Sequence, residues 1–365
     1  MTRRLAVHAV TRGGAALGRR LADGLAADLL VADPVADAAP GARPFALPMR
    51  EAVARTFGEY DGHVFVLAVG AAVRLVAPLL ASKRTDPAVV CVDEAGRFAV
   101  AVLSGHAGGA NALAEEAARV VGAVPVVTTA SDAQGTLRVD LLGAELGWTL
   151  EDPAGNATRT AAAIVNGDPV LVLDEAGDGA WWPAGRPLPA NVEVARALDG
   201  RDPSRWAAVI AVTDRAARED EVLRRAILWR PRTLAVGVGC DRGASAAAVW
   251  TAVASALEAQ GLAPASVRAV ATIDLKHDEA GIVALASRLG CPLRLFPAEA
   301  LDGVAGIERP SAVVRRHVGT RGVCEPAALL AAGATRLLAP KQAWRDPADG
   351  RSVTVAIARA PREVA

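Results

Sequence analysis

The sequence predicts an α/β protein with a mainly parallel sheet in its N-terminal region, a middle segment and a separate C-terminal α/β domain. Short apolar runs alternate with helical patterns through the first 140 residues, which is typical of strands joined by crossover helices. A second alternation of the same kind starts at Thr233, after Arg230-Pro231-Arg232. We therefore expect an N-terminal domain over 1–140, a middle region over 141–230 and a C-terminal domain over 231–360.

The elements of the N-terminal domain follow from local patterns. Apolar runs predict strands, alanine- and leucine-rich stretches predict helices, and glycine or aspartate clusters predict turns. We expect a strand over 5–10, a turn over 11–14, a helix over 15–25, a strand over 64–69, a helix near 73–80, a hairpin of strands 88–92 and 97–103, a helix after Asn111 and a strand over 124–128. Ligands of such sheets bind outside the carboxyl ends of the strands. We therefore expect Gly13, Gly70 and the segments 104–111 and 129–132 to meet at one edge.

The same patterns continue through the rest of the chain. In the middle region they predict only a helix over 158–165 and a strand over 169–173. In the C-terminal domain they predict strands over 234–238, 267–273, 293–296 and 353–358, helices over 245–259, 280–289 and 325–332, and a loop over 239–243. Lys276 and Lys341 are each expected at the end of a strand.

Composition limits the classes of partner and compartment. The chain has 365 residues, is 52% hydrophobic and has a formal net charge of zero, so its charge favours neither nucleic acid nor an anionic membrane. Its apolar stretches are too short for a membrane span or a signal peptide. Four separated cysteines without a CxxC pair fit a reducing compartment, and five scattered histidines lack metal-ligand spacing. We expect a cytoplasmic protein without a metal site.

The most informative segment is Ser104-Gly105-His106-Ala107-Gly108-Gly109-Ala110-Asn111. It joins a predicted strand to a predicted helix through glycines, so several backbone N–H groups are expected to point at one anion. His106 adds a side chain that transfers protons near neutral pH, and we expect it to contact the ligand or to act in catalysis. Asn111 is expected at the helix N-cap, where asparagine is common without any other function. Ser104 lacks the preceding glycine of a GxSxG nucleophile elbow.

Other motifs are weaker. The segment 237–243 reads GxGxxxG, one residue longer than the dinucleotide fingerprint, and no GxxxxGK[ST] sequence occurs. A Rossmann dehydrogenase and a P-loop enzyme are therefore disfavoured. Cys240 falls at an expected helix N-terminus, which would stabilise a thiolate, although a small side chain packed under the turn is the simpler interpretation.

Charged residues past the predicted strands suggest a polyanionic ligand. Of 40 basic residues only three are lysines, namely Lys83, Lys276 and Lys341. A lysine is a compact charge that can lose its proton, whereas drift in an arginine-rich sequence explains the same counts. Arg74, Lys83 and Asp86 form one polar group, and Asp274 accompanies Lys276. A solvated rim would have the same composition.

These segments resemble the CbiG family, the cobalt-precorrin-5A hydrolases of anaerobic cobalamin biosynthesis. The resemblance covers nearly the whole chain and is most specific in LSGHAGGAN, Leu103 to Asn111. It also includes 73–80, 82–83, 86–90 and 128–132, and then 237–243, 271–276 and 340–341 in the C-terminal domain, which is similar to CobE. Ser131, where threonine is usual, and His277, where lysine is common, are small departures. The middle region matches loosely.

The resemblance implies an enzyme that opens the δ-lactone of cobalt-precorrin-5A and releases acetaldehyde to give cobalt-precorrin-5B. The cobalt belongs to the tetrapyrrole substrate, so no cofactor is expected. His106 would position or deprotonate the attacking water, and amide groups near Gly108, Gly109 and Ala110 would stabilise the oxyanion. A lysine that captures the carbonyl as a Schiff base is an alternative route.

The resemblance gives catalytic roles to His106 and Ser104. Substrate contacts are expected at Arg74, Lys83, Gly105, Gly108, Gly109, Asn111, Thr129, Asp132, Gly239, Cys240, Arg242, Asp274, Lys276 and Lys341. The active site falls in the first domain, in the last or between them. The expected partners are the tetrapyrrole and other enzymes of the pathway. Two other functions remain as alternatives: a non-catalytic carrier of corrinoid intermediates, and a methyltransferase, for which no sequence feature demands an S-adenosylmethionine pocket.

Overall fold

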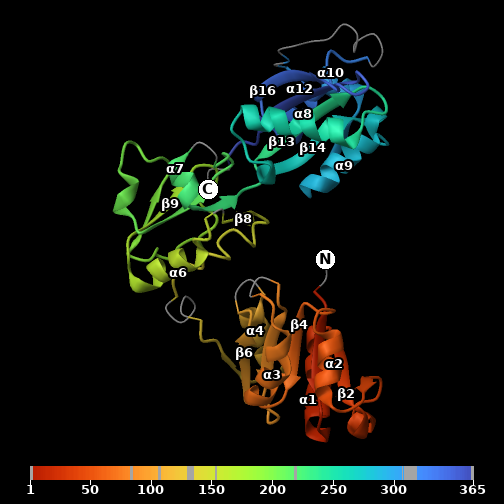
Figure 1. The fold of residues 1–365 in the computed structure, drawn as a ribbon, viewed down its shortest axis with the longest axis vertical. Helices are drawn as coiled ribbons and strands as arrows, with labels where there is room; N and C mark the ends of the chain where they lie inside the picture. Colours follow the sequence, from red (N-terminus) through yellow and green to blue (C-terminus); the bar gives the residue numbers. More distant parts are fainter. Residues whose placement is uncertain are drawn as a thin grey trace. The chain divides into compact units, whose positions relative to one another are not determined.

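The protein is described by a computed structural model. It describes residues 3–82, 85–105, 108–129, 135–152, 154–217, 220–305, 307 and 319–362. The chain divides into two compact units, Met1–Leu141 and Leu142–Ala365. The first unit contains one sheet and the second contains two (Figure 1). Within the described residues, no helix is both long enough and apolar enough to cross a membrane.

The first unit is built on a seven-stranded sheet in the order β3-β2-β1-β4-β5-β6-β7. Its strands are β1 (Leu5–Ala9), β2 (Asp28–Ala32), β3 (Arg43–Phe45), β4 (Gly62–Val66), β5 (Ala88–Val92), β6 (Phe98–Leu103) and β7 (Val124–Val126). Its helices are α1 (Arg12–Leu25), α2 (Met49–Thr56), α3 (Val69–Val76) and α4 (Ala110–Val121), with short 3-10 turns η1 (Asp33–Ala38) and η2 (Ala77–Leu79).

The strands of this sheet do not all run the same way. β1 to β5 are mutually parallel, as the alternation of strands and helices predicts. β6 turns back through a hairpin and pairs antiparallel with β5, and β7 is parallel to β6. The carboxyl ends of β6 and β7 therefore lie at the edge where β1, β4 and β5 begin.

Helices cover both faces of the seven-stranded sheet (Figure 1). On one face α1 and α4 bury Leu17, Leu21 and Leu113 against the strands. On the other face α2 and α3 bury Val53 and Val76. The central strands β1, β4 and β5 are buried along their whole length, which explains their nearly continuous apolar sequences.

The second unit begins with a five-stranded sheet in the order β10-β9-β11-β12-β8. β8 is antiparallel to β12, whereas the other neighbours are parallel. The strands are β8 (Thr149–Glu151), β9 (Val170–Asp174), β10 (Val192–Ala195), β11 (Ala208–Val212) and β12 (Ile227–Arg230), with helices α6 (Ala157–Asn166) and α7 (Glu221–Arg225) and the 3-10 turn η3 (Pro203–Arg205).

The second sheet of this unit has the order β15-β14-β13-β17-β16. β13, β14 and β15 are parallel, and β17 is antiparallel to both of its neighbours. The strands are β13 (Leu234–Cys240), β14 (Val267–Ile273), β15 (Leu293–Phe296), β16 (Leu337–Arg345) and β17 (Ser352–Arg359). The helices are α8 (Ala246–Ala259), α9 (Ala280–Leu289), α10 (Ala298–Asp302) and α12 (Cys324–Ala332), with 3-10 turns η4 (Pro264–Ser266) and η5 (Asp274–Lys276). α8 and α9 cover one face and α12 the other (Figure 1).

The predicted fold class is confirmed, although several boundaries differ. The segment 11–14 is not a turn, because Thr11 caps α1 and the helix starts at Arg12. The strand expected over 64–69 ends at Val66, and Gly70 lies inside α3. The sequence patterns miss β2, β3, α2, β8, β10, β11 and β12, most of which are short.

Candidate functional site

The glycine-rich loop 104–109 starts at the end of β6 and is closed by hydrogen bonds to the first turn of α4. Ser104 has a left-handed backbone with a φ of 57°. Its carbonyl accepts the amide N–H of Ala110 at 3.0 Å, and the carbonyl of Gly105 accepts that of Asn111 at 3.0 Å. The amide of Ala110, which the sequence suggests as an oxyanion donor, is therefore already used within the loop.

Two glycines are required by the shape of this loop. A Cβ on Gly108 would lie 2.3 Å from the Cβ and 2.9 Å from the carbonyl oxygen of Ser104, so any larger side chain would force the loop open. Gly109 has a φ of 84° and forms the N-cap of α4. His106, the predicted proton-transfer residue, lies outside the described residues.

Asn111 links the loop to the end of β7. It is not the N-cap that the sequence predicts, because the helix begins one residue earlier, at Ala110. Its side chain is buried, and its Nδ2 donates to Oγ1 of Thr129 at 2.9 Å. A Cβ on Gly105 would lie 2.7 Å from Oδ1 of Asn111, so the backbone passes directly over this amide. Six of the predicted site residues thus lie together, namely Ser104, Gly105, Gly108, Gly109, Asn111 and Thr129, whereas Asp132 is outside the described residues.

Asp86 connects the segment at Ala81 and Ser82 to the start of the loop 104–109. Its carboxylate, which is 9% exposed, accepts the amide N–H groups of Ala81 at 3.0 Å and Ser82 at 3.1 Å. Its backbone carbonyl accepts the hydroxyl of Ser104 at 3.0 Å. Lys83 follows Ser82 in the chain but lies outside the described residues. The sequence places Asp86 in a polar group but gives no sign of this contact, which depends on the hairpin register.

Arg74 does not lie in this polar group. Its Nη1 donates to the carbonyl of Gly70 at 2.9 Å, at the start of its own helix. Gly70 follows the carboxyl end of β4, whereas Asp86 precedes the amino end of β5, and β4 and β5 are parallel. The guanidinium of Arg74 is therefore at the opposite edge of the sheet from Asp86.

The expectation that all the glycine-containing turns meet at one edge is wrong for the same reason. Gly13 and Gly70 lie at the carboxyl edge of β1 and β4, and the loop after β6 lies at their amino edge. At the start of α1, Glu94 accepts the Thr11 hydroxyl and the amide N–H of Gly14, the latter at 3.1 Å. A carboxylate of the protein itself thus occupies the helix N-terminus that the sequence would assign to an anionic ligand.

In the second unit, the residues after β13 and β14 lie at one edge but are already paired. Lys276 Nζ is 3.0 Å from Oε2 of Glu279, and Glu279 also accepts the amide N–H of Gly243 at 2.7 Å. Arg242 Nη1 is 2.6 Å from Asp278 on the exposed surface. A substrate carboxylate would have to compete with these acids. The sequence patterns do not identify Glu279 as a site residue. The only feature that could indicate it is its position directly before α9.

Two further expectations in the second unit, those for Gly239 and Cys240, change in the structure. Gly239 and Cys240 belong to β13 itself, and α8 begins only at Ala246, so Cys240 is not at a helix N-terminus. Burial raises the pKa of the Cys240 thiol to about 11, which keeps it protonated at neutral pH. Asp274 follows the end of β14, as the sequence predicts, and lies on the exposed turn η5.

Lys341 is inside β16 rather than at its end. The strand continues to Arg345, and the backbone N–H of Lys341 donates to Oε1 of Glu325 at 2.9 Å. Glu325 is 1% exposed and lies in the first turn of α12. Pro340 precedes this position, and the register of β16 against β17 shifts between Ala339 and Gln342, so the sequence resembles a strand end.

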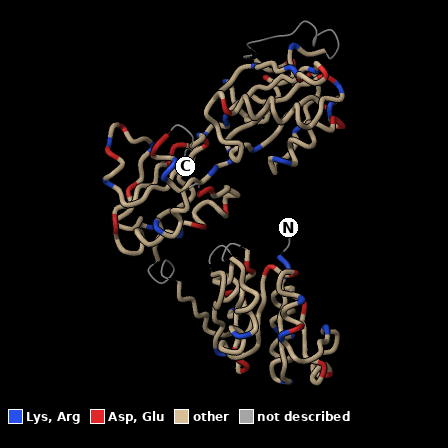
Figure 2. Tube along the Cα trace, viewed as in Figure 1, with Lys and Arg blue, Asp and Glu red and all other residues tan. Residues whose placement is uncertain are grey.

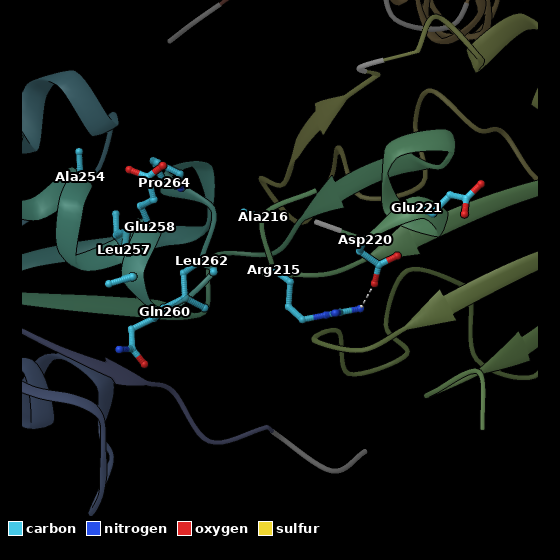
Figure 3. A pocket seen from close by; sticks show the side chains of 12 residues that line it. Arg215, Ala216, Asp220, Glu221, Ala254, Leu257, Glu258, Gln260, Leu262 and Pro264 are labelled. Carbon is cyan, nitrogen blue, oxygen red and sulfur yellow. Dashed lines mark hydrogen bonds and ion pairs between the residues drawn. The ribbon is translucent and has the colours of Figure 1, made fainter. Parts of the chain in front are cut away.

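One pocket among the described residues, with a volume of about 1000 Å³, is not lined by any predicted site residue. It lies in the second unit between the segment after β11 and the end of α8 (Figure 3). Figure 3 shows Arg215 reaching to Asp220, 3.0 Å away, and Arg215 is also paired with Glu175. Glu221 and Glu258 add negative charge to the described lining. This charge disfavours a ligand rich in carboxylates.

Charge is mixed over both units. Figure 2 shows lysine and arginine interspersed with aspartate and glutamate along the chain, in keeping with a formal net charge of zero. Among the residues that the structure describes, no group of three or more histidine, cysteine, aspartate or glutamate side chains could hold a metal ion.

Three family descriptions match consecutive parts of the chain. The family description "Cobalamin synthesis G N-terminal" matches residues 51–132, "Cobalamin biosynthesis central region" matches 138–231 and "Cobalamin synthesis G C-terminus" matches 234–358. All three describe proteins of cobalamin synthesis. The chain belongs to the cobalamin synthesis G (CbiG) family.

Curated relatives match over most of their length. A protein of Priestia megaterium named cobalt-precorrin-5A hydrolase is 38% identical over 307 residues, which are 84% of this chain and 80% of the relative. A protein of the same name from Salmonella typhimurium is 33% identical over 331 residues, covering 89% and 91% of the two chains. A solved structure of CobE, a protein from the cobalamin (vitamin B12) biosynthetic pathway, is 34% identical with a TM-score of 0.32, covering 36% of this chain and 92% of that one.

Proposed function

We propose that this chain is a cobalt-precorrin-5A hydrolase, which opens the δ-lactone of its substrate and releases a two-carbon fragment as acetaldehyde to give cobalt-precorrin-5B. The observation that carries the proposal is the 38% identity to the Priestia megaterium hydrolase across most of both chains. The cobalt enters as part of the tetrapyrrole substrate, and we propose that the reaction uses no further cofactor.

The loop 104–109 supplies the groups that lactone opening requires. When water adds to the lactone carbonyl, negative charge develops on the carbonyl oxygen, and fixed N–H donors stabilise it. The amides of Ala110 and Asn111 already donate to the carbonyls of Ser104 and Gly105. We therefore propose the amides of Gly108 and Gly109 as the oxyanion donors.

His106 is proposed as the general base. It stands in the sequence between Gly105 and Gly108, and histidine is the side chain that most often acts as a general base in enzymes. It takes a proton from water as the oxygen attacks. His106 returns this proton to the leaving oxygen as the lactone C–O bond breaks, which gives an alcohol and a carboxylic acid that ionises in water. In the retro-aldol step the alcohol gives its proton to solvent, the C–C bond breaks, its electron pair passes to the macrocycle, and acetaldehyde leaves.

Ser104 has no nucleophilic role in this proposal. Its hydroxyl donates to the backbone carbonyl of Asp86, which is not a base that could take the proton. Thr129 and, from their positions in the chain, Lys83 and Asp132 are proposed to contact the substrate at this edge. In the second unit, Lys276 is paired with Glu279 and Arg242 with Asp278. These cations would contact the substrate only if a substrate carboxylate displaced the paired acid.

The test is release of acetaldehyde from purified cobalt-precorrin-5A, measured as NADH oxidation by a coupled alcohol dehydrogenase. We expect the wild-type chain to release acetaldehyde catalytically. His106→Ala should reduce turnover by about 100-fold or more. His277→Ala, which alters an exposed histidine of the second unit, is the matched control and should retain wild-type turnover.

The outcomes separate the parts of the proposal. If the folded wild-type chain binds the substrate tightly but releases no acetaldehyde, it is a carrier and not a hydrolase. If His106→Ala turns over as the wild type does, the hydrolase assignment stands and His106 is removed from the mechanism.

A further inference from the structure

Ser104 adopts a backbone conformation that serine rarely occupies. Its φ of 57° is in the left-handed region, which costs a residue with a Cβ about 1 kcal/mol. Two other described non-glycine residues share this conformation, Ala26 and Asp199. Ala26 is the C-cap of α1, where a left-handed residue is common, and Asp199 stands in an exposed turn. Ser104 follows a strand and leads into the loop 104–109, so a helix end does not explain it.

Three contacts hold Ser104 in this conformation. Its hydroxyl donates to the carbonyl of Asp86 at 3.0 Å, and its own carbonyl accepts the amide of Ala110 at 3.0 Å. Gly108 folds back against it so closely that a Cβ would meet the serine Cβ at 2.3 Å. The conformation of Ser104 therefore sets the direction in which the chain leaves Gly108 and Gly109.

Asp86 is fixed in turn by a second loop. Both of its carboxylate oxygens accept the amide of Ala81, at 3.0 and 3.2 Å, and Oδ1 also accepts that of Ser82. The amide of Asp86 itself donates back to the carbonyl of Ser82 at 2.8 Å. These bonds fix the backbone of Asp86. Its carbonyl is therefore held in place as the acceptor for the Ser104 hydroxyl.

We propose that Ser104 and Asp86 are positioning residues, which hold the amides of Gly108 and Gly109 in the orientation that the oxyanion needs. This inference rests on the proposed function. A glycine at position 104 would adopt the same φ without the steric cost. What serine adds is the hydroxyl that binds the loop to Asp86. The steric cost of this φ is similar to the contribution of one hydrogen bond, so the serine fixes the loop with little net effect on stability.

Ser104→Gly separates the two effects. It removes the steric cost and the hydroxyl together, and these two effects oppose each other, so we expect an unfolding midpoint close to that of the wild type. Turnover should fall about 10- to 100-fold because the donors are no longer held in place, with KM little changed because the donors act on the transition state. Ala26→Gly, which alters another left-handed residue of the same unit outside the loop, is the control and should leave both kcat and KM unchanged.

Substitution of Asp86 tests the second half of the inference. Asp86→Asn keeps an oxygen that accepts the amides of Ala81 and Ser82, so turnover should stay close to that of the wild type. Asp86→Ala removes both bonds, and turnover should fall as it does in Ser104→Gly. Equal turnover of Asp86→Ala and the wild type would remove Asp86 from the inference.

The failure of this inference is distinct from failure of the proposed function. Wild-type kcat in Ser104→Gly, while the wild-type chain releases acetaldehyde, overturns the inference alone. If the wild type releases none, hydrogen exchange of the peptide over 104–111 decides the point. Faster exchange at Gly108 and Gly109 in Ser104→Gly supports the positioning role, and unchanged exchange overturns it.

Discussion

A buried pair of histidines makes the stability of the first unit depend on pH. His8 on β1 and His63 on β4 are both fully buried, and His8 Nε2 lies 3.0 Å from His63 Nδ1. His63 Nε2 lies 3.1 Å from the carbonyl of Phe57, and the His8 ring stacks on Phe65 at 4.7 Å. Two neutral rings are able to form both hydrogen bonds. His63 donates from Nε2 to the Phe57 carbonyl and accepts at Nδ1 from Nε2 of His8. A proton added to either ring would place a charge in the core.

Burial lowers the pKa of both rings in the folded protein. For His8 burial is the larger cause, and the neighbouring His63 lowers its pKa further. For His63 the Phe57 carbonyl opposes the effect of burial without cancelling it. The unfolded chain, with histidine pKa values of about 6.5, then binds more protons than the folded chain below that pH. Stability is therefore complete above about pH 6.5 and falls as the pH decreases.

The size of the loss follows from linkage. A histidine that remains neutral in the folded state lowers stability by about 2 kcal/mol at pH 5.0 relative to pH 7.5, and the pair by at most about 4 kcal/mol. Carboxylates whose pKa the fold lowers, such as Asp93 and Asp349, act only below about pH 5. The window between pH 7.5 and 5.0 therefore reports the histidines.

Hydrogen exchange of peptides from β1 and β4, corrected for the intrinsic pH dependence of exchange, measures the opening free energy of the first unit. The second unit supplies an internal control, because all 7 tryptophans lie beyond residue 141 and their fluorescence follows that unit alone. We expect the pH effect in β1 and β4 to disappear in His8→Leu/His63→Leu, which removes both polar partners together. A wild-type protein whose β1 and β4 are equally stable at both pH values would refute the reasoning, as would a double variant that keeps the full pH dependence.

Two further predictions concern the helices: one tests the cap of α1, and the other tests the packing of α12. Glu94→Ala removes the cap of α1 and should lower stability by about 1 kcal/mol, and Glu94→Gln should lower it by about 0.5 kcal/mol. Hydrogen exchange of the α1 peptide measures both changes. An unchanged exchange rate in Glu94→Ala contradicts the prediction. Gly237→Ala would place a Cβ 1.8 Å from the carbonyl oxygen of Cys324 in α12, and should lower stability by about 3 kcal/mol or more in urea unfolding followed by tryptophan fluorescence. Gly303→Ala, whose Cβ would have its nearest contact at 3.5 Å, is the control and should unfold as the wild type does.

The parts of the fold that the sequence predicts well are those with continuous burial. β1, β5 and β14 are long apolar runs because both faces of each strand are covered, and their predicted bounds are within about one residue of the structure. β3 and β8 have three residues each, and a three-residue strand leaves almost no periodic signal. Their place in the sheet is decided by neighbouring strands, which a local pattern does not contain.

The two lysines predicted to contact the ligand illustrate a second limit of prediction from sequence. Lys276 and Lys341 are unusual in this sequence, and the structure places Lys276 against Glu279 and the amide of Lys341 against Glu325. Both acids are nearly fully buried and belong to the beginnings of α9 and α12. The scarcity of lysine draws attention to these two positions, but it does not indicate the acids beside them, which only folding brings close.

The direction of β6 explains why the loop prediction is correct locally and wrong globally. β6, the loop 104–109, α4 and β7 form a strand–helix–strand unit whose two strands are parallel, so the loop and Thr129 both lie at the carboxyl ends of that unit. The hairpin between β5 and β6 reverses the unit relative to β1 to β5. Segments that precede β1 to β5 therefore lie at the same edge as the loop. Asp86, two residues before β5, is one such residue, and its carbonyl accepts the Ser104 hydroxyl. Substrate contacts beyond the loop are accordingly expected from the turns before β1, β4 and β5, and not from Gly13 or Gly70 at the opposite edge.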